Sequence, residues 1–336
     1  MRDAWYIAAA ARDLGARPLA RQICGVPMVL FRGRDGRPAA LQDRCAHRAV
    51  ALSRGRVAGG CVVCPYHGWT FDDRGACVAI PANRAEDPIP GGATVPAYPA
   101  VERDGYVWVW PAGGEARDEP FSIPHLTDRA WCWIRLEARI RNGVLNVIEN
   151  FIDNPHTGYI HGGLFRQPAS HLAHHTVRQV PDGVVIDIDE EARGDSLLAR
   201  LLLRAGERVE HQDRYVAPAT VQVAYTFGPR RRAIGWQFCT PVAEDETHVF
   251  VHVTWSAGLL TPLIKPFARI AGKIILAQDK DILDHQGEQL RRFGPQATFC
   301  STAADTANLW IAGYLRRLRD GEAAARDHEK RVTFRV

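Results

Sequence analysis

The chain has 336 residues, of which 46% are hydrophobic and 24% are charged, and its formal net charge is +4. This length allows two ordinary domains, each with its own packed core. So small a positive charge argues against nucleic-acid binding, and no apolar run is long enough to cross a membrane.

The eight cysteines are scattered, without the spacing of a disulfide framework. The chain starts Met1-Arg2-Asp3-Ala4-Trp5, which lacks the pattern of a secretory signal. The sequence therefore predicts a cytoplasmic protein.

Residues 1–115 have the pattern of short strands and turns. The runs 26–32 and 106–111 are rich in β-branched and aromatic residues and are bounded by Gly or Asp. Residues 111–120 are polar and rich in Pro and Gly, which is typical of a linker. We therefore expect an all-β domain over residues 1–115 and a second domain over residues 116–336.

Two short pairs of metal-ligating residues lie in the first domain. Cys45-Ala46-His47 and Cys64-Pro65-Tyr66-His67 are separated by sixteen residues. A Rieske [2Fe-2S] centre needs two thiolates on one iron and two imidazoles on the other, and these pairs offer that set. A Cys2His2 zinc site uses the same residue types, but zinc fingers pair like with like. The predicted cluster ligands are Cys45, His47, Cys64 and His67, and Cys61 is expected to be a core residue.

The second domain shows a mixture of patterns. Strands are predicted over 131–140, 221–227, 233–238 and 247–255, and a helix over 144–161. Residues 165–215 look charged and irregular, apart from a short apolar helix over 196–203. A long helix over 262–292 is expected to be the last regular element.

A second metal site is indicated within the predicted helix 144–161. His156 and His161 are five residues apart and can share one metal if the helix is locally distorted, which Pro155 favours. A mononuclear ferrous site needs two histidines and one carboxylate, with positions left open.

The carboxylate is expected from the long helix, which offers Asp279, Asp281 and Asp284. Helical phase places Asp281 and Asp284 on a mostly polar face. An unpartnered carboxylate is costly to bury, so Asp279 on the apolar face needs a cation and is the predicted ligand. The residues that share its face in this prediction are Ile275, Leu276, Ile282, Leu283 and Gln286.

Both motifs resemble those of Rieske non-heme iron oxygenases. The loop Cys64-Pro65-Tyr66-His67-Gly68-Trp69 matches the family pattern fully, and residues 150–161 match the pattern N-x-x-D-x-x-H-x-x-x-x-H. In the first loop, Ala46 and Ala49 replace the usual Pro and Gly. The resemblance, closest to the single-chain vanillate O-demethylase-like branch, implies an α+β fold: an N-terminal all-β Rieske domain followed by a helix-grip catalytic domain.

The resemblance also implies a function. It is that of a terminal oxygenase with a [2Fe-2S] cluster and a mononuclear Fe(II), which uses O2 and electrons from NAD(P)H through a reductase or ferredoxin. Such an enzyme hydroxylates or demethylates a small aromatic or cyclic substrate, with dioxygenation as the open alternative, and forms a homotrimer. Asp153 would bridge His156 and the His67 of a neighbouring subunit, and Asn150 would lie beside the iron. The alternatives are a Rieske electron carrier without oxygenase chemistry and a zinc-stabilised binding module.

The sequence does not identify the substrate. Pocket residues are expected from 165–215 and from the inner faces of the later strands. Residues 228–232, Gly-Pro-Arg-Arg-Arg, are predicted to be an exposed turn, with contact to an anionic group or to an acidic electron donor as the weaker alternative. Residues 262–276 are amphipathic and predict a core-facing helix, with membrane contact as the weaker alternative. Four aromatic residues are expected in the core rather than in the pocket: Trp236, Phe238, Phe250 and Trp255.

Overall fold

The computed structural model describes residues 1–162, 172–191, 209–228, 231–294, 299–322 and 328–335. Its contacts divide the chain into two compact units. One consists of Met1–Pro124 with Thr240–Ala243, and the other of His125–Cys239 with Glu244–Val336.

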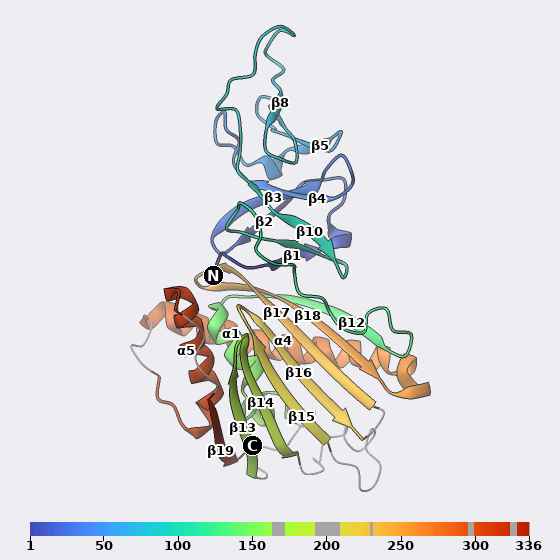
Figure 1. The fold of residues 1–336 in the computed structure, drawn as a ribbon, viewed down its shortest axis with the longest axis vertical. Coiled ribbons are helices and arrows are strands. Elements are labelled where there is room, and N and C mark those ends of the chain that lie inside the picture. Colours follow the sequence, from blue (N-terminus) through green and yellow to red (C-terminus); the bar gives the residue numbers. More distant parts are fainter. Residues whose placement is uncertain (163–171, 192–208, 229–230, 295–298, 323–327, 336) are drawn as a thin grey trace. The chain divides into compact units, whose positions relative to one another are not determined.

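The first unit is built from antiparallel strands in three small sheets (Figure 1). The strand orders are β1-β11-β10, β2-β3-β4-β9 and β5-β6-β7-β8. The all-β prediction for this part of the chain is therefore confirmed. Its elements are β1 Tyr6–Ala10, η1 Ala11–Asp13, β2 Leu19–Ile23, β3 Val26–Arg32, β4 Pro38–Gln42, η2 Leu52–Arg54, β5 Arg56–Ala58, β6 Cys61–Val63, β7 Thr70–Phe71, β8 Cys77–Ala79, β9 Ala97–Tyr98, β10 Ala100–Arg103 and β11 Tyr106–Val109.

A hydrophobic core supports the loops that carry the two Cys/His pairs. Phe31, Leu41 and Phe71 are fully buried in it, and Cys45 and Cys64 are buried in the same cluster. Cys61 is also buried, as predicted. Strand side chains alternate between faces, so the inward residues of these short strands meet below the loops and fix where each loop begins.

The second unit is an antiparallel sheet of eight strands in the order β12-β18-β17-β16-β15-β14-β13-β19, with helices on it (Figure 1). The long helix α4 packs against β12, which is the helix-grip arrangement predicted. Its elements are β12 Cys132–Ile140, α1 Val144–Ile152, α2 His156–Ile160, β13 Leu172–Val180, β14 Gly183–Glu191, β15 Val209–Val216, β16 Thr220–Phe227, β17 Arg231–Ala243, β18 Glu246–Ser256, η3 Gly258–Ile264, α4 Lys265–Phe293, η4 Ala303–Asp305, α5 Thr306–Asp320 and β19 Glu329–Arg335.

Two expectations for this unit are wrong. Residues 165–215 are not irregular where the structure describes them, because they form β13, β14 and β15. Polar side chains occupy inward positions of these strands, which hides the alternation: His175, Gln179, His211 and Asp213 are all buried. The long helix is also not the last element, since α5 and β19 follow it. The short helix expected over 196–203 lies outside the described residues.

The phase of α4 was predicted only in part. Leu276, Asp279 and Leu283 are buried as expected, and Asp281 is exposed. Ile282, however, is 41% exposed. Asp284 was expected on the polar face but is buried, because it accepts a hydrogen bond of 2.7 Å from the backbone N–H of Arg141 and is paired with Lys280.

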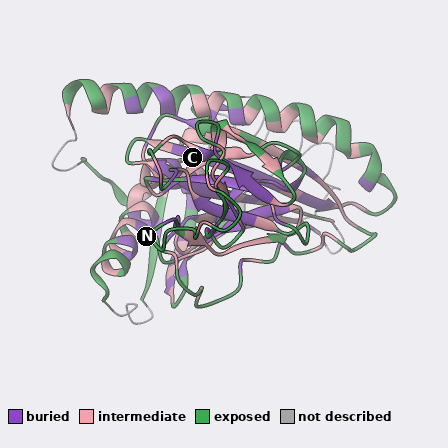
Figure 2. Ribbon diagram, turned by 90° about the horizontal axis from the view of Figure 1, so that it is seen from above, coloured by how far each residue is buried: buried purple, intermediate pink, exposed green. Residues whose placement is uncertain are grey.

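Small residues let α4 approach β12 closely. A Cβ on Gly287 would lie 2.0 Å from the carbonyl oxygen of Arg141, and one on Gly272 would lie 2.8 Å from Cδ1 of Leu136. The opposite side of the helix is exposed along its length (Figure 2). None of the described helices has the length and hydrophobicity needed to cross a lipid bilayer.

We expect Gly287→Ala to destabilise the protein by roughly 1–3 kcal/mol, because the added methyl overlaps a backbone oxygen and forces α4 away from β12. The control is Gly313→Ala in the middle of α5, where nothing lies within 4 Å of the added Cβ. That change should be neutral or stabilising by up to about 1 kcal/mol. Thermal unfolding followed by circular dichroism checks both; equal effects would contradict the close packing.

Candidate metal centres and substrate cavity

The two Cys/His loops have the same backbone geometry. In each, the cysteine N–H donates to the carbonyl five residues later: Cys45 to Val50 at 2.9 Å and Cys64 to Trp69 at 2.8 Å. The residue four positions after each cysteine has a left-handed backbone, with φ of 59° at Ala49 and 73° at Gly68. The turn therefore explains the Gly usual at both places, and Ala49 carries a cost of about 1–2 kcal/mol.

The side chains of these loops fit a metal cluster. Cys45 and Cys64 are each 2% exposed, and the rings of His47 and His67 lie 4.6 Å apart between centroids. His47 stacks on Trp69, and among the described residues its Nδ1 is buried without a hydrogen-bond partner. Such an atom is costly unless something binds it, and a metal ion would.

The second site begins where the predicted helix 144–161 breaks. Helix α1 ends at Ile152, Asp153 is extended with ψ of 115°, and α2 starts at His156 after Pro155. Proline removes an N–H and crowds the preceding turn, so the chain reorients here. This is the distortion expected from the sequence, and it brings the rings of His156 and His161 to 5.3 Å between centroids.

Both imidazoles converge on one carboxylate. Nε2 of His161 lies 3.1 Å from Oδ1 of Asp279, and Nε2 of His156 lies 3.6 Å from the same oxygen. His161 is 2% exposed and Asp279 3%. The buried carboxylate thus meets two imidazole nitrogens on the same side, which is a set of donor residues that suits Fe(II).

The neighbouring side chains fix the orientation of each ligand. Nδ1 of His161 lies 2.9 Å from Oε1 of Gln278, and Nδ1 of His156 contacts the backbone carbonyl oxygen of Asp153 and lies 3.3 Å from Oδ2 of the same residue. Asn150 donates to Oδ1 of Asp279 at 3.0 Å. Each Nδ1 is therefore engaged, so that Nε2 is the nitrogen that faces Asp279. The sequence did not point to Gln278, although its place directly before Asp279 was the available signal.

The electrostatics of this triad also suit a cation. Burial alone would raise the pKa of Asp279, but hydrogen bonds from His156 and His161 lower it to about 2. Burial alone would lower the pKa of His156, whereas the carboxylates of Asp153 and Asp279 raise it to about 9. The site therefore concentrates negative charge that attracts a positive one, either a proton or a metal ion.

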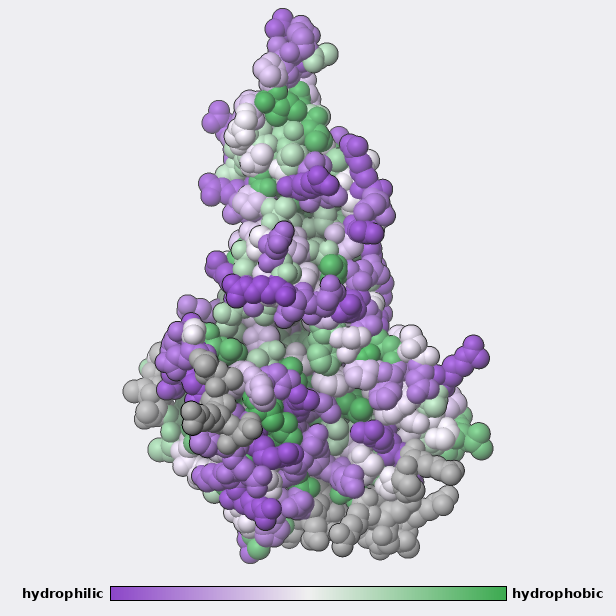
Figure 3. Space-filling view, viewed as in Figure 1, coloured by the Kyte–Doolittle hydropathy of each residue, from purple (hydrophilic) through white to green (hydrophobic). Residues whose placement is uncertain are grey.

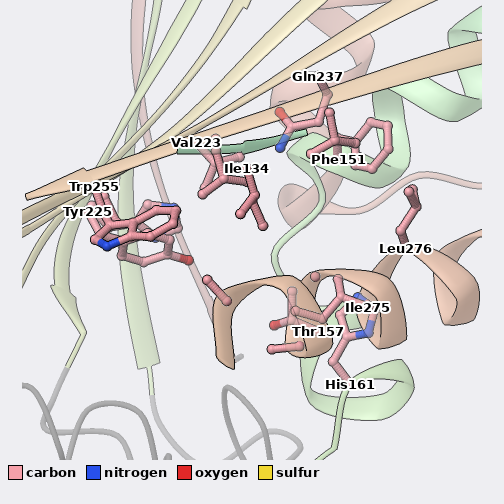
Figure 4. Close-up of a pocket in the computed structure, with 18 of the residues that line it drawn as sticks. Ile134, Phe151, Thr157, His161, Val223, Tyr225, Gln237, Trp255, Ile275 and Leu276 are labelled. Carbon is pink, nitrogen blue, oxygen red and sulfur yellow. The ribbon is translucent and has the colours of Figure 1, made fainter. Parts of the chain in front are cut away.

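A cavity of about 430 Å³ adjoins the triad. Aromatic and aliphatic side chains from the sheet form one wall, and α2 and α4 form the other (Figure 4). Of the four aromatics expected in the core, Trp255 lines the cavity, whereas Trp236, Phe238 and Phe250 are buried and not part of its wall. Apolar residues in the wall include Ile134, Phe151, Val223, Tyr225, Phe227, Val253, Ile264, Ile275 and Leu276.

A few polar groups interrupt this apolar wall. Nε2 of His211 lies 2.8 Å from Oδ1 of Asp213, both are buried, and His211 stacks on Tyr225. Sequence reasoning missed this pair because it lies in the stretch expected to be irregular. Arg231 and Arg232 also line the cavity, so the predicted turn 228–232, where the structure describes it, is not simply a solvent-facing one.

Comparison with known proteins agrees with both domains. Residues 4–99 match the family model "Rieske [2Fe-2S] domain", and residues 142–321 match "Vanillate O-demethylase oxygenase C-terminal domain". The dicamba O-demethylase oxygenase component of Stenotrophomonas maltophilia is 37% identical over 164 residues, which are 48% of each chain. The vanillate O-demethylase oxygenase subunit of Pseudomonas sp. strain HR199 is 34% identical over 169 residues, 49% of this chain and 46% of that protein.

The crystal structure of dicamba monooxygenase bound to dicamba has the same fold. It superposes with a TM-score of 0.80 and 24% identity, over 95% of this chain and 97% of that one. The alignments with the curated relatives span about half of their length.

Fold and family models define a Rieske [2Fe-2S] domain joined to a helix-grip domain with a His/Asp triad. The chain belongs to the vanillate O-demethylase oxygenase family. The resemblance to Rieske oxygenases noted in its motifs is therefore confirmed.

If Asp279 is the carboxylate ligand, Asp279→Ala should lose mononuclear iron by a factor of at least about 10–100 in affinity, since an entire ligand disappears. The [2Fe-2S] cluster should stay. The matched control is Asp281→Ala, two residues away on the exposed face of α4. Iron and acid-labile sulfide are measured for both. Iron lost from the Asp281 variant but not from the Asp279 variant would overturn the assignment.

Proposed function

We propose that this protein is the terminal oxygenase of a multicomponent Rieske system. In this proposal residues 1–115 accept electrons and residues 116–336 carry out the chemistry. The observation that supports it most is the His156–His161–Asp279 triad at the edge of an apolar cavity, with His161 and Asp279 buried. An electron carrier without oxygenase chemistry needs neither the triad nor the cavity.

Each metal group has a proposed set of ligands. Cys45, His47, Cys64 and His67 would hold the [2Fe-2S] cluster, and His156, His161 and Asp279 would hold Fe(II), with Asn150 beside it. When bound, the cluster supplies electrons one at a time and the Fe(II) supplies a place for dioxygen activation. Asp153 and Gln278 orient the two imidazoles, and the apolar wall excludes water from the reacting carbon.

The proposed reaction is hydroxylation or oxidative demethylation of a small aromatic or cyclic compound. A C–H bond is replaced by C–OH; the second oxygen atom of O2 leaves as water, with two electrons from NAD(P)H and two protons. A hydroxylated methoxy carbon then leaves as formaldehyde. The size and apolar walls of the cavity suit a single ring, and the curated relatives are named for ring compounds, dicamba and vanillate.

The proposed partners are an NAD(P)H-dependent reductase or a ferredoxin, together with further copies of this chain. In a cyclic homotrimer, Asp153 would connect His156 to the His67 of the adjacent subunit and carry electrons across the boundary. Cytoplasmic location and a role in the breakdown of aromatic compounds complete the proposal.

The proposal is tested with protein that carries both metal groups, a surrogate reductase and NADH. Methoxylated and methylated ring compounds are screened for oxygen uptake, formaldehyde release and product mass. We expect at least one to raise oxygen uptake several-fold and to give a product gaining oxygen or losing a methyl group. The control is Asp279→Ala, which should show neither. A screen in which the fully loaded enzyme reduces its cluster but never gives an oxygenated product would count against the proposal.

Asp153→Asn tests the bridge. Oδ2 of Asp153 accepts a hydrogen bond of 3.0 Å from the backbone N–H of His156 and lies near the ring Nδ1. Asn keeps the shape but removes the charge, so iron and cluster contents should be unchanged. Turnover should fall by about 100-fold or more, although the reductase still reduces the cluster.

The control is Asp281→Asn, which changes the same charge at an exposed position. A variant at Asp153 that turns over normally would remove the bridge from the proposal. So would full activity of a monomer, shown by light scattering at the assay concentration. Neither result would affect the assignment of the iron ligands.

A further inference from the structure

An exposed apolar stripe runs along η3 and the first half of α4. Leu263, Phe267, Ile270 and Ile274 are 65%, 73%, 61% and 46% exposed. Their spacing of four, three and four residues places them on one face over about 16 Å of helix. Leu259 and Leu260, just before them, are 98% and 57% exposed. Single exposed apolar residues are ordinary, but a continuous set of this length marks a contact surface.

Apart from Phe267, which belongs to both, this stripe is distinct from the face of the helix that lines the cavity. The cavity is lined by Ala268, Ala271 and Ile275, which lie to one side of the stripe. Figure 2 shows the outer surface of the long helix exposed while the strands beneath it are buried. Figure 3 shows hydrophobic side chains gathered at the right-hand edge of the second unit, where the orange chain of Figure 1 turns into the helix. The prediction that residues 262–276 form a core-facing helix thus explains the face that lines the cavity but not the exposed apolar face.

A row of positive charge borders the other side of the stripe. Arg269 and Lys273 are exposed and four residues apart, whereas Lys265 is turned toward the sheet, with its Nζ 5.4 Å from the ring centroid of Trp133 in β12. From residue 247 to residue 278 the chain contains no Asp or Glu, so this basic row has no acidic neighbour along the sequence. An apolar stripe beside a basic row is the arrangement of helices that lie in the interface of anionic membranes.

Within the part of the chain that the structure describes, the cavity reaches the surface beside this stripe. Phe267 lines the cavity and is nevertheless 73% exposed, so its ring stands at the mouth. A compound dissolved in a surface covering the stripe would therefore meet the opening without crossing water.

We propose that residues 259–274 bind this protein peripherally to an anionic phospholipid surface. Leu263, Ile270 and Ile274 enter the acyl boundary, and Arg269 and Lys273 meet phosphate groups. A second copy of the chain fits less well, because a two-fold contact through this face would bring the basic rows together. The inference does not depend on the oxygenase proposal.

The test is sedimentation of the purified protein with sucrose-loaded vesicles. One set is pure phosphatidylcholine and the other contains 30% phosphatidylglycerol. Because apolar insertion and charge act together, we expect the phosphatidylglycerol vesicles to hold at least about fivefold more protein at low salt, with partial release at about 0.5 M NaCl. Equal sedimentation with both kinds of vesicle, or none with either, would overturn the proposal.

Paired variants locate the contact. Leu263→Ser with Ile270→Ser should lower the vesicle-bound fraction by about tenfold or more, since two inserted side chains are lost. Leu309→Ser with Leu318→Ser is the control: these are exposed leucines of α5, at 54% and 43%, and binding should not change. Cluster colour and iron content confirm that both variants fold.

Two results would contradict this location. The first is vesicle binding that survives the Leu263/Ile270 change in a variant with intact metal contents. The second is a wild-type protein that ignores vesicles but loses an oligomeric state, measured by light scattering, when these two residues are changed. The stripe would then be a contact between copies of the chain.

Discussion

The second unit is organised around a carboxylate that cannot stay buried alone. Asp279 is 3% exposed, and an isolated ionised carboxylate in such a place would cost several kcal/mol. Three groups approach it: the amide of Asn150 in α1, Nε2 of His156 at the start of α2, and Nε2 of His161 directly after α2. These contacts require that Asp279 points inward from α4. They also require that α1 ends at Ile152 and that α2 begins at His156.

The break between α1 and α2 follows from this requirement. In one continuous helix, side chains five residues apart point in directions about 140° apart, so His156 and His161 would not converge. Pro155 ends the first helix, and Asp153 in the gap is extended and sits against the imidazole of His156. The same irregularity therefore separates the helices, turns the two rings toward Asp279 and supplies the group that orients one of them.

Much of this could be predicted because the chemistry is local. The Cys/His pairs lie in tight loops whose ligands are close in sequence. The break in the helix is likewise predicted by a single residue, Pro155. Other features depend on distant partners. Helical phase placed Asp284 on the solvent-facing side of α4. The residue is buried instead, and its carboxylate accepts a hydrogen bond from the backbone N–H of Arg141, which directly follows β12. Strand β15 looked irregular because its inward positions hold His211 and Asp213, where a strand usually has apolar residues. These two polar side chains can be buried because they are hydrogen-bonded to each other.

Helix α4 shows why a single pattern of hydrophobicity was not enough. Its first half has apolar residues on two faces: Ile275 and Ala271 line the cavity, while Ile270 and Ile274 remain exposed. The hydrophobic pattern of such a helix indicates only that it is amphipathic. Its apolar surface is wider than one packing partner can cover. Further along, Gly287 allows close approach to the backbone, and the helix becomes polar on its outer side. The two halves therefore obey different constraints: contact with the sheet sets the position of Asp279, whereas the exposed arc near η3 is left for a surface outside this chain.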